Sequence, residues 1–126
     1  IEMAANMYRD VESELGQDDS ATEEFAVFLS HKKKHPHPEI GNAAERLAKQ
    51  LYKEFRHKHM KAFLDVKHLR KITAKALAQH IRHCSYMIVL VDDQTWHSKW
   101  CQFEWLVAQN FGVPVFVLFD TDDYSV

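Results

Sequence analysis

The stretch YMIVLVDDQTWHSKWCQFEWLVAQNFG, residues 86–112, decides the fold of this chain. It opens with the apolar run 86–91, and its length and lack of charge predict a strand buried on both faces of a sheet. The polar residues 92–94 end that strand. A helix is predicted next, with Trp100 and Glu104 near its start, and Gly112 ends it.

Trp100 and Glu104 stand out within this stretch because they lie four residues apart at the start of the expected helix. That spacing places both side chains on one helical face. Glu104 is followed at once by the apolar residues 105–107, so we expect it at the edge of a core. A carboxylate held beside an indole near the carboxyl end of a sheet fits a catalytic site. The alternative for so short a pattern is that Trp100 is a core residue and Glu104 a solvated helix residue.

The rest of the chain alternates short apolar runs with amphipathic segments. Strands are expected at residues 25–29, 61–65, 86–91 and 115–119. Helices are expected between them, at residues 42–59, from Thr73 onward, and in the segment that holds Trp100 and Glu104. This alternation specifies a parallel sheet covered by helices on both faces, with the ligand site outside the carboxyl ends of the strands. Ser30, Asp65 and residues 92–98 are therefore expected at one rim together with Glu104.

Composition limits the classes of function that remain. A chain of 126 residues, 46% of them hydrophobic, is long enough for one domain with a real core. Its net charge of -2 implies no attraction to nucleic acid, and its apolar runs are too short for membrane insertion. The two cysteines, Cys84 and Cys101, make no disulfide framework and favour the cytoplasm. The nine histidines lack partners at metal-ligand spacing, so surface histidines are favoured over a metal site.

The amino-terminal part of the chain differs from the rest. Met3, Met7, Val11 and Leu15 recur at helical spacing and predict a short amphipathic helix, which packs either on the domain or on a partner. A polar, acidic linker follows. The expected organisation is therefore a helix and linker at residues 1–22 and one domain at residues 23–126.

Three sequence boxes together resemble a known family. FAVFLSHKK begins the domain, AFLD forms the second expected strand, and YMIVLV is followed by SKWCQFE. In this order and spacing they resemble a TIR (Toll/interleukin receptor) domain over about residues 24–120, and SKWCQFE is most similar to NAD-cleaving members of the plant immune receptor type. The resemblance implies an α/β, flavodoxin-like three-layer domain with a parallel sheet. Relatives continue with a helix, a fifth strand and a final helix, so the domain is expected to be truncated after its fourth strand.

The resemblance implies one of two activities. Some TIR domains hydrolyse NAD+ at the nicotinamide–ribose bond, with NAD+ as substrate and no cofactor, and others are non-catalytic scaffolds that act by TIR–TIR self-association. Catalytic members carry a glutamate at the position of Glu104, which favours the enzyme. The loop 66–72 is short and lacks the Gly and Pro of many relatives, which leaves the mode of assembly open. Other flavodoxin-like proteins fit poorly, since a phospho-receiver needs acids where this chain has Ser30 and His31.

The same resemblance assigns roles to particular residues. Glu104 is the expected catalytic carboxylate, because it can stabilise the positive charge that develops on the ribose. Trp100 is expected to wall the nicotinamide or ribose side, and His31 to stack on adenine. Lys32 or Lys33 is expected to meet the pyrophosphate, although such charge runs are usually solvated.

Phe63 and Asp65 match family positions that line the site. Their ordinary alternatives are a core residue for Phe63 and a turn cap for Asp65. In this interpretation the chain is a cytoplasmic signalling domain of a larger protein in innate immunity or cell death, with NAD+, further TIR domains and its own neighbouring domains as partners.

Overall fold

A computed structural model gives the arrangement of most of the chain. It describes residues 2–12, 14–15, 24–31, 43–64, 73–91 and 98–119. The statements below concern these segments. Lys32, Lys33 and Asp65 lie outside them, as do the loop 66–72 and residues 92–97.

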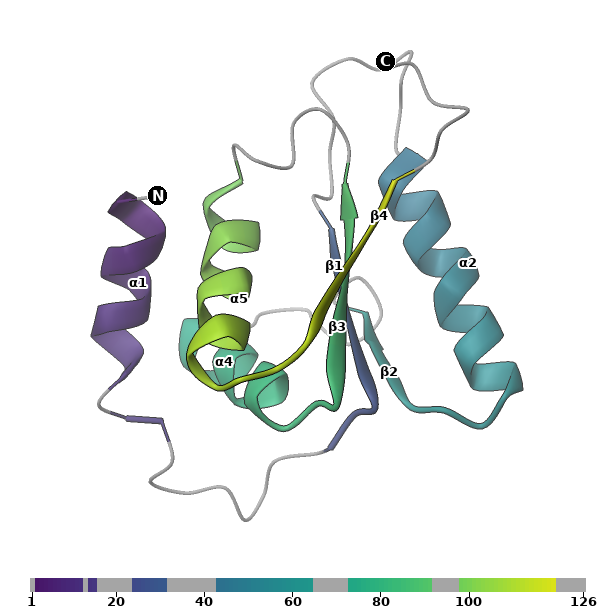
Figure 1. Cartoon of the computed structure of the whole chain (residues 1–126), viewed down its shortest axis with the longest axis horizontal. Coiled ribbons are helices and arrows are strands. Elements are labelled where there is room, and N and C mark those ends of the chain that lie inside the picture. Colours follow the sequence, from purple (N-terminus) through teal and green to yellow (C-terminus); the bar gives the residue numbers. More distant parts are fainter. Residues whose placement is uncertain are drawn as a thin grey trace.

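The centre of the described structure is a sheet of four parallel strands (Figure 1). The strands are ordered β2-β1-β3-β4, and their bounds are Ala62–Leu64 for β2, Val27–His31 for β1, Tyr86–Val91 for β3 and Val115–Phe119 for β4. β1 is a central strand with partners on both edges, and all five of its side chains are buried. The sheet confirms the parallel arrangement that the alternating sequence pattern predicts.

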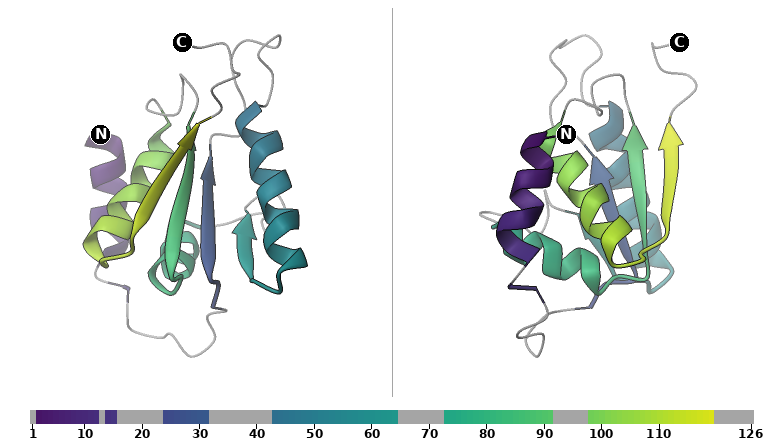
Figure 2. Two further views of the ribbon diagram at one scale, coloured as in Figure 1. Left: turned by 45° about the vertical axis from the view of Figure 1, so that its right-hand side comes forward. Right: turned by 60° about the vertical axis from the view of Figure 1, so that its left-hand side comes forward.

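Helices cover both faces of this sheet (Figure 2). α2 (Ala43–His57) lies on one face, whereas α4 (Ala74–Arg82) and α5 (Lys99–Asn110) lie on the other. α1 (Glu2–Glu12) lies outside α5 and α4. This three-layer α/β arrangement confirms the predicted flavodoxin-like fold.

The first strand lies later in the chain than its apolar run suggests. The sequence predicts a strand at residues 25–29 followed by a loop, but Ser30 and His31 belong to β1. The reason is the ladder with β3, in which Ser30 pairs with Val89 and His31 with Leu90. Because β3 extends far enough to bond both residues, the backbone stays in the sheet although the side chains turn polar.

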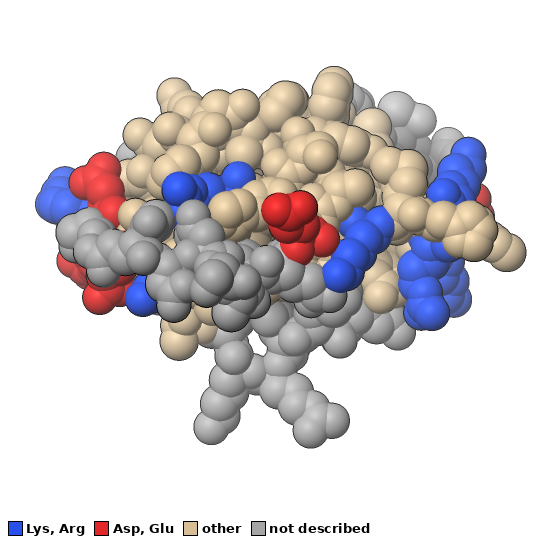
Figure 3. Space-filling view, turned by 90° about the horizontal axis from the view of Figure 1, so that it is seen from below, with Lys and Arg blue, Asp and Glu red and all other residues tan. Residues whose placement is uncertain are grey.

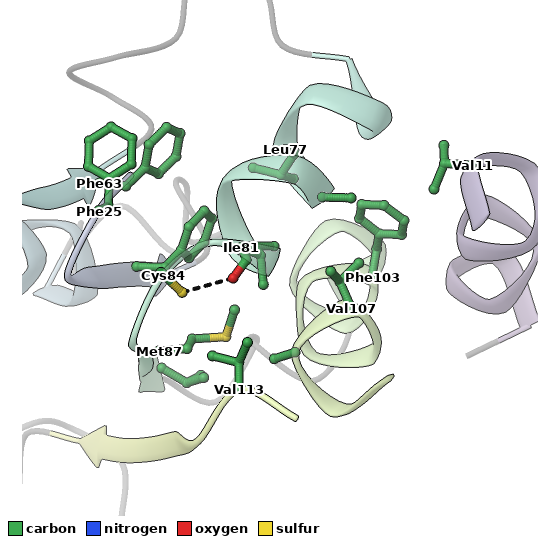
Figure 4. Close-up of a cluster of buried hydrophobic side chains, with 14 of the residues drawn as sticks. Val11, Phe25, Phe63, Leu77, Ile81, Cys84, Met87, Phe103, Val107 and Val113 are labelled. Carbon is green, nitrogen blue, oxygen red and sulfur yellow. Dashed lines mark hydrogen bonds between the residues drawn. The ribbon is translucent and has the colours of Figure 1, made fainter. Parts of the chain in front are cut away.

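The core consists of two clusters separated by the sheet. Strand residues alternate between them, since successive side chains point to opposite faces. Phe28, Phe63 and Phe103 belong to the cluster under α4 and α5, part of which is drawn in Figure 4. Phe28 and Phe63 are stacked with their ring centroids 4.8 Å apart. Val27 and Leu29 belong to the cluster under α2.

Hydroxyl side chains cap two of the helices, and the sequence predicts the first of these caps. The Thr73 hydroxyl accepts a hydrogen bond from the Ala76 amide at 3.1 Å, which confirms the predicted cap of α4. The Ser98 hydroxyl accepts one from the Cys101 amide at 3.2 Å and so caps α5. Beyond the end of α5, Gly112 has a φ of 70°, a conformation that glycine adopts without strain.

The amino-terminal helix packs on the domain, which decides between the two possibilities left by the sequence. Ala4 and Val11 are buried in the cluster under α4 and α5, and Val11 faces Phe103 in Figure 4. Met7 is partly buried against the same cluster, but Met3 is exposed. The contact face of α1 is therefore narrower than the apolar repeat of the sequence suggests.

The edge of the described sheet that β4 forms is apolar and exposed. On β4, residues 115–118 are each at least 40% exposed, although they read Val-Phe-Val-Leu. Tyr86 makes an edge-on contact with Phe116, with ring centroids 5.8 Å apart. Among the described strands, β4 thus carries its apolar side chains largely on the surface.

On the face seen in Figure 3, basic and acidic described residues are interspersed at both ends.

A search of the described residues finds no group of His, Cys, Asp and Glu that could hold a metal ion. None of the described helices is both long and apolar enough to cross a membrane. Cys84 and Cys101 are buried, and neither forms a disulfide.

The docking of α1 can be tested by truncating two apolar side chains of the same helix. Val11→Ala removes buried methyl groups next to Phe103, so we expect the free energy of unfolding to fall by about 1–2 kcal/mol. Met3→Ala is the matched control, because Met3 is exposed, and it should change the free energy by less than about 0.5 kcal/mol. Urea unfolding followed by circular dichroism measures both values. Equal effects of the two substitutions would contradict the docking of α1.

Cys84 predicts a loss of stability at alkaline pH. Burial raises the pKa of its thiol from 9.0 to about 11, and the thiol donates to the Ile81 carbonyl oxygen at 3.0 Å. Above pH 9 the unfolded chain loses this proton while the folded chain keeps it. The protonated Cys84 thiol therefore makes its full contribution to the free energy of unfolding below pH 9. As the pH rises to 11, about 2–3 kcal/mol of this free energy is lost progressively.

Urea unfolding between pH 8 and pH 11 measures this effect. The control is Cys84→Ala, since all other groups that titrate in this range are shared with the parent. We expect the parent to lose more stability than the variant over the range. Parallel curves would show that the thiol ionises equally in both states.

Candidate functional site

The candidate site lies at the end of the sheet where the parallel strands terminate. The strand arrows of Figure 1 point to this rim, and α5 begins there. β1 ends at His31, so Ser30 lies near the rim as the penultimate residue of a central strand. Glu104 lies in the second turn of α5. The fold therefore brings together a strand end and a helix start that are far apart in sequence.

A hydrogen bond joins Ser30 to Glu104 inside the protein. The Ser30 hydroxyl donates to Oε1 of Glu104 at 2.5 Å, across 74 residues of sequence. The Ser30 side chain is fully buried and Glu104 is 5% exposed. A carboxylate removed from water needs such a donor, and a hydrogen bond to a charged group is stronger than one between neutral groups. The bond thus stabilises an acidic group that is removed from water.

The local sequence explains how Glu104 reaches this position. The Ser98 cap fixes where α5 begins, and helical periodicity then turns residue 104 toward the sheet together with Cys101 and Phe103. Ser30 shares its sheet face with Phe28, two residues earlier in β1. This arrangement confirms that Glu104 lies at the edge of the core and contradicts the alternative of a solvated helix residue.

Trp100 lies on the surface one helical turn closer to the rim. It is 40% exposed, and its indole contacts Phe103 edge-on with ring centroids 6.2 Å apart. The alternative of a core tryptophan is therefore wrong. An exposed indole placed one turn before a buried carboxylate leaves an aromatic surface available beside the rim.

His31 ends β1 at the same rim but faces the other way. Its side chain is buried and, by the alternation of the strand, lies on the α2 face of the sheet, opposite the face of Ser30 and Glu104. The structure thus brings His31 and Glu104 to one edge without bringing them to one face. Its expected contact with adenine stays a prediction.

Phe63 is part of the core in this structure. It is 1% exposed, stacks on Phe28, and contacts Phe25 edge-on with ring centroids 5.2 Å apart. His80 packs on the same ring at 4.9 Å. These contacts favour the structural alternative for Phe63, whereas Lys32, Lys33 and Asp65 lie outside the described residues.

Sequence reasoning did not single out Ser30 as a functional residue. The available signal was a hydroxyl in an otherwise apolar run, two residues after Phe28 and so on the same sheet face. A small polar side chain at such a position needs a buried partner. The sequence does not say which of the many acids of the chain supplies it.

The chemistry of this arrangement is that of a single buried carboxylate. Among the described residues, Glu104 is the one buried acid, and the other buried polar side chains are Ser30, His31 and Gln79. A lone carboxylate can stabilise a developing positive charge. Among the described residues no second buried carboxylate is found, which does not favour catalysis by a buried acid and base pair.

The difference in burial between exposed Trp100 and buried Phe103 can be tested by stability measurements. Phe103→Ala empties a fully buried site and should lower the free energy of unfolding by about 3–5 kcal/mol. Trp100→Ala removes an exposed ring and should cost about 1 kcal/mol or less. Urea unfolding measures both, with Phe103→Leu as a milder substitute if the alanine variant does not fold. A loss of free energy of unfolding for Trp100→Ala as large as that for Phe103→Ala would contradict the surface position of Trp100.

Comparison with known proteins identifies the family. The family model described as TIR domain matches residues 27–125, which span the sheet from β1 to β4 and include Ser30 and Glu104. The helix α1 lies outside the matched region. The comparison with curated proteins gives no match. Since the matched region covers most of the chain and the fold agrees with it, the chain belongs to the TIR domain family.

Proposed function

We propose that this TIR domain hydrolyses NAD+ at the nicotinamide–ribose bond as a signal in innate immunity or cell death. Membership of the family supports a signalling role. The observation that carries the catalytic proposal is the carboxylate of Glu104, buried and held by Ser30 at the ligand-binding end of the sheet. TIR domains that only assemble do not need a carboxylate at this position.

The reaction suits a single carboxylate. Breaking the bond between C1′ of the ribose and the nicotinamide nitrogen returns the bonding electron pair to nicotinamide, which leaves as a neutral molecule. No strong general acid is therefore required. Positive charge develops on the ribosyl centre, and the Glu104 carboxylate stabilises it. Water then adds at C1′ and releases a proton, which gives ADP-ribose.

The remaining expected residues take supporting roles in this proposal. Trp100 offers its exposed indole as a wall beside the nicotinamide or ribose. His31 stacks on adenine if its ring turns outward at the end of β1, and Lys32 or Lys33 meets the pyrophosphate. Asp65 lines the site, while Phe63 supports its floor from the core. The free thiols support a reducing compartment, the cytoplasm.

A non-catalytic scaffold is the second candidate. It is favoured by membership of the TIR domain family, which suggests TIR–TIR interactions. In this alternative the domain acts by TIR–TIR self-association, and the bond between Ser30 and Glu104 has a structural role alone. Self-association and catalysis are compatible, so the two candidates differ in turnover and not in assembly.

NAD+ turnover at high protein concentration, with and without a crowding agent, tests the proposal. Glu104→Ala should lower nicotinamide release by at least about 100-fold, because it removes the group that stabilises the transition-state charge. Glu54→Ala is the matched control, since Glu54 is an exposed glutamate on α2, and it should retain parental turnover. Circular dichroism first establishes that all three proteins are folded.

The outcomes separate the candidates. Release by the parent and by Glu54→Ala, but not by folded Glu104→Ala, would support the enzyme. Oligomers without any release, detected by light scattering in the same samples, would support the scaffold. Turnover that survives Glu104→Ala would place the catalytic group elsewhere.

A further inference from the structure

The strand residue beneath Glu104 is unusual for its position. β1 is bonded to β2 on one edge and to β3 on the other, and its residues before Ser30 are Val27, Phe28 and Leu29. Ser30 interrupts this apolar run at a site without any solvent exposure. An apolar side chain would fill such a site at lower cost, because a buried hydroxyl must find a partner. That partner is the Glu104 carboxylate.

The bond connects a rigid element to a flexible side chain. Ser30 has a short side chain on a central strand, in register with Val89 of β3. Glu104 has a longer side chain with several rotatable bonds, which loses rotamer freedom when it is held in one place. A donor fixed at 2.5 Å from Oε1 therefore selects the orientation of the carboxylate before any ligand arrives. Groups held in advance in this way contribute to transition-state stabilisation.

We propose that Ser30 is a positioning residue for Glu104: its buried hydroxyl holds the carboxyl group oriented toward the ribosyl centre. The inference rests on the proposed NAD+ hydrolysis. Ser30 acts through Glu104 and does not touch the substrate. Its loss therefore affects the step in which charge develops and leaves substrate binding nearly unchanged.

Three variants test this role by steady-state kinetics. Ser30→Ala should lower kcat by about 10- to 100-fold, with KM changed by less than about 3-fold. Ser30→Thr keeps the hydroxyl and should restore most of the lost kcat. Ser85→Ala is the matched control, because Ser85 is an exposed serine just before β3, and it should behave like the parent.

A second measurement tests the pairing without any activity. The shift in unfolding midpoint caused by Ser30→Ala is compared in the parent and in Glu104→Ala. If the two side chains are partners, the shift should be smaller once Glu104 is absent, because the substitutions are then not additive. This comparison also decides the matter if the extra methyl group of Ser30→Thr prevents folding.

The possible failures are distinguishable. A loss of kcat with KM retained, together with rescue by Thr or non-additive midpoints, supports the positioning role. An active parent that loses turnover in Glu104→Ala but keeps it in Ser30→Ala overturns this inference and leaves the proposed function standing. A raised KM with unchanged kcat also overturns it. A parent with no turnover under any assembling condition overturns the proposed function and the positioning role together.

Discussion

The structure depends on the burial of β1 on both faces and along both edges. A parallel central strand cannot expose either face to water, so its five buried side chains require a helical layer on each side of the sheet. α2 supplies one layer, and α4 and α5 supply the other. The order of the strands then places the end of β1 beside the start of α5. Every feature of the candidate site follows from this one placement, because the site consists of what β1 and α5 bring to a shared rim.

The layer that carries Glu104 is itself covered from outside. α5 presents Phe103 and Val107 toward the core, and Trp105 and Leu106 are partly buried against the same cluster, so apolar side chains surround much of this helix. α1 covers part of the outer side of α5 through Ala4 and Val11. It does so from outside the region that matches the TIR family. The helix that carries Glu104 is thus packed partly against a helix that the family match does not include.

Periodicity predicted the elements of this fold well, because each strand and helix is determined mainly by its own local pattern. The four parallel strands, the Thr73 cap and the buried position of Glu104 follow from the sequence in this way. The local pattern did not predict where β1 ends, because backbone pairing with β3 continues the strand through two polar residues. The sheet face of His31 depends on that same register, so the sequence pattern alone did not show it.

The site was harder to predict than the fold because it depends on pairs distant in sequence. Glu104 was found from its neighbours, but its partner Ser30 lies 74 residues away, and local spacing does not connect them. The exposure of Trp100 is equally non-local, since it depends on what packs over the first turn of α5. A resemblance assigns residues to a site by position in a motif, whereas contacts decide their role. Phe63 shows this difference, because its motif position suggests the site and its ring contacts place it in the core.

Trp100 is exposed whereas Glu104 is buried, and this difference bears on the chemistry that the site can perform. A carboxylate exposed to water would be screened and would attract a developing cation weakly, whereas one held in a poorly solvated layer acts more strongly on a nearby charge. The Ser30 hydroxyl offsets part of the cost of that burial. The indole one turn above remains at the surface, where a flat apolar ring can meet a ligand before the carboxylate does. In the proposed reaction, an exposed aromatic ring and a buried carboxyl group one helical turn apart suit a substrate whose reacting centre becomes positive, as a ribosyl group does when it loses a neutral base.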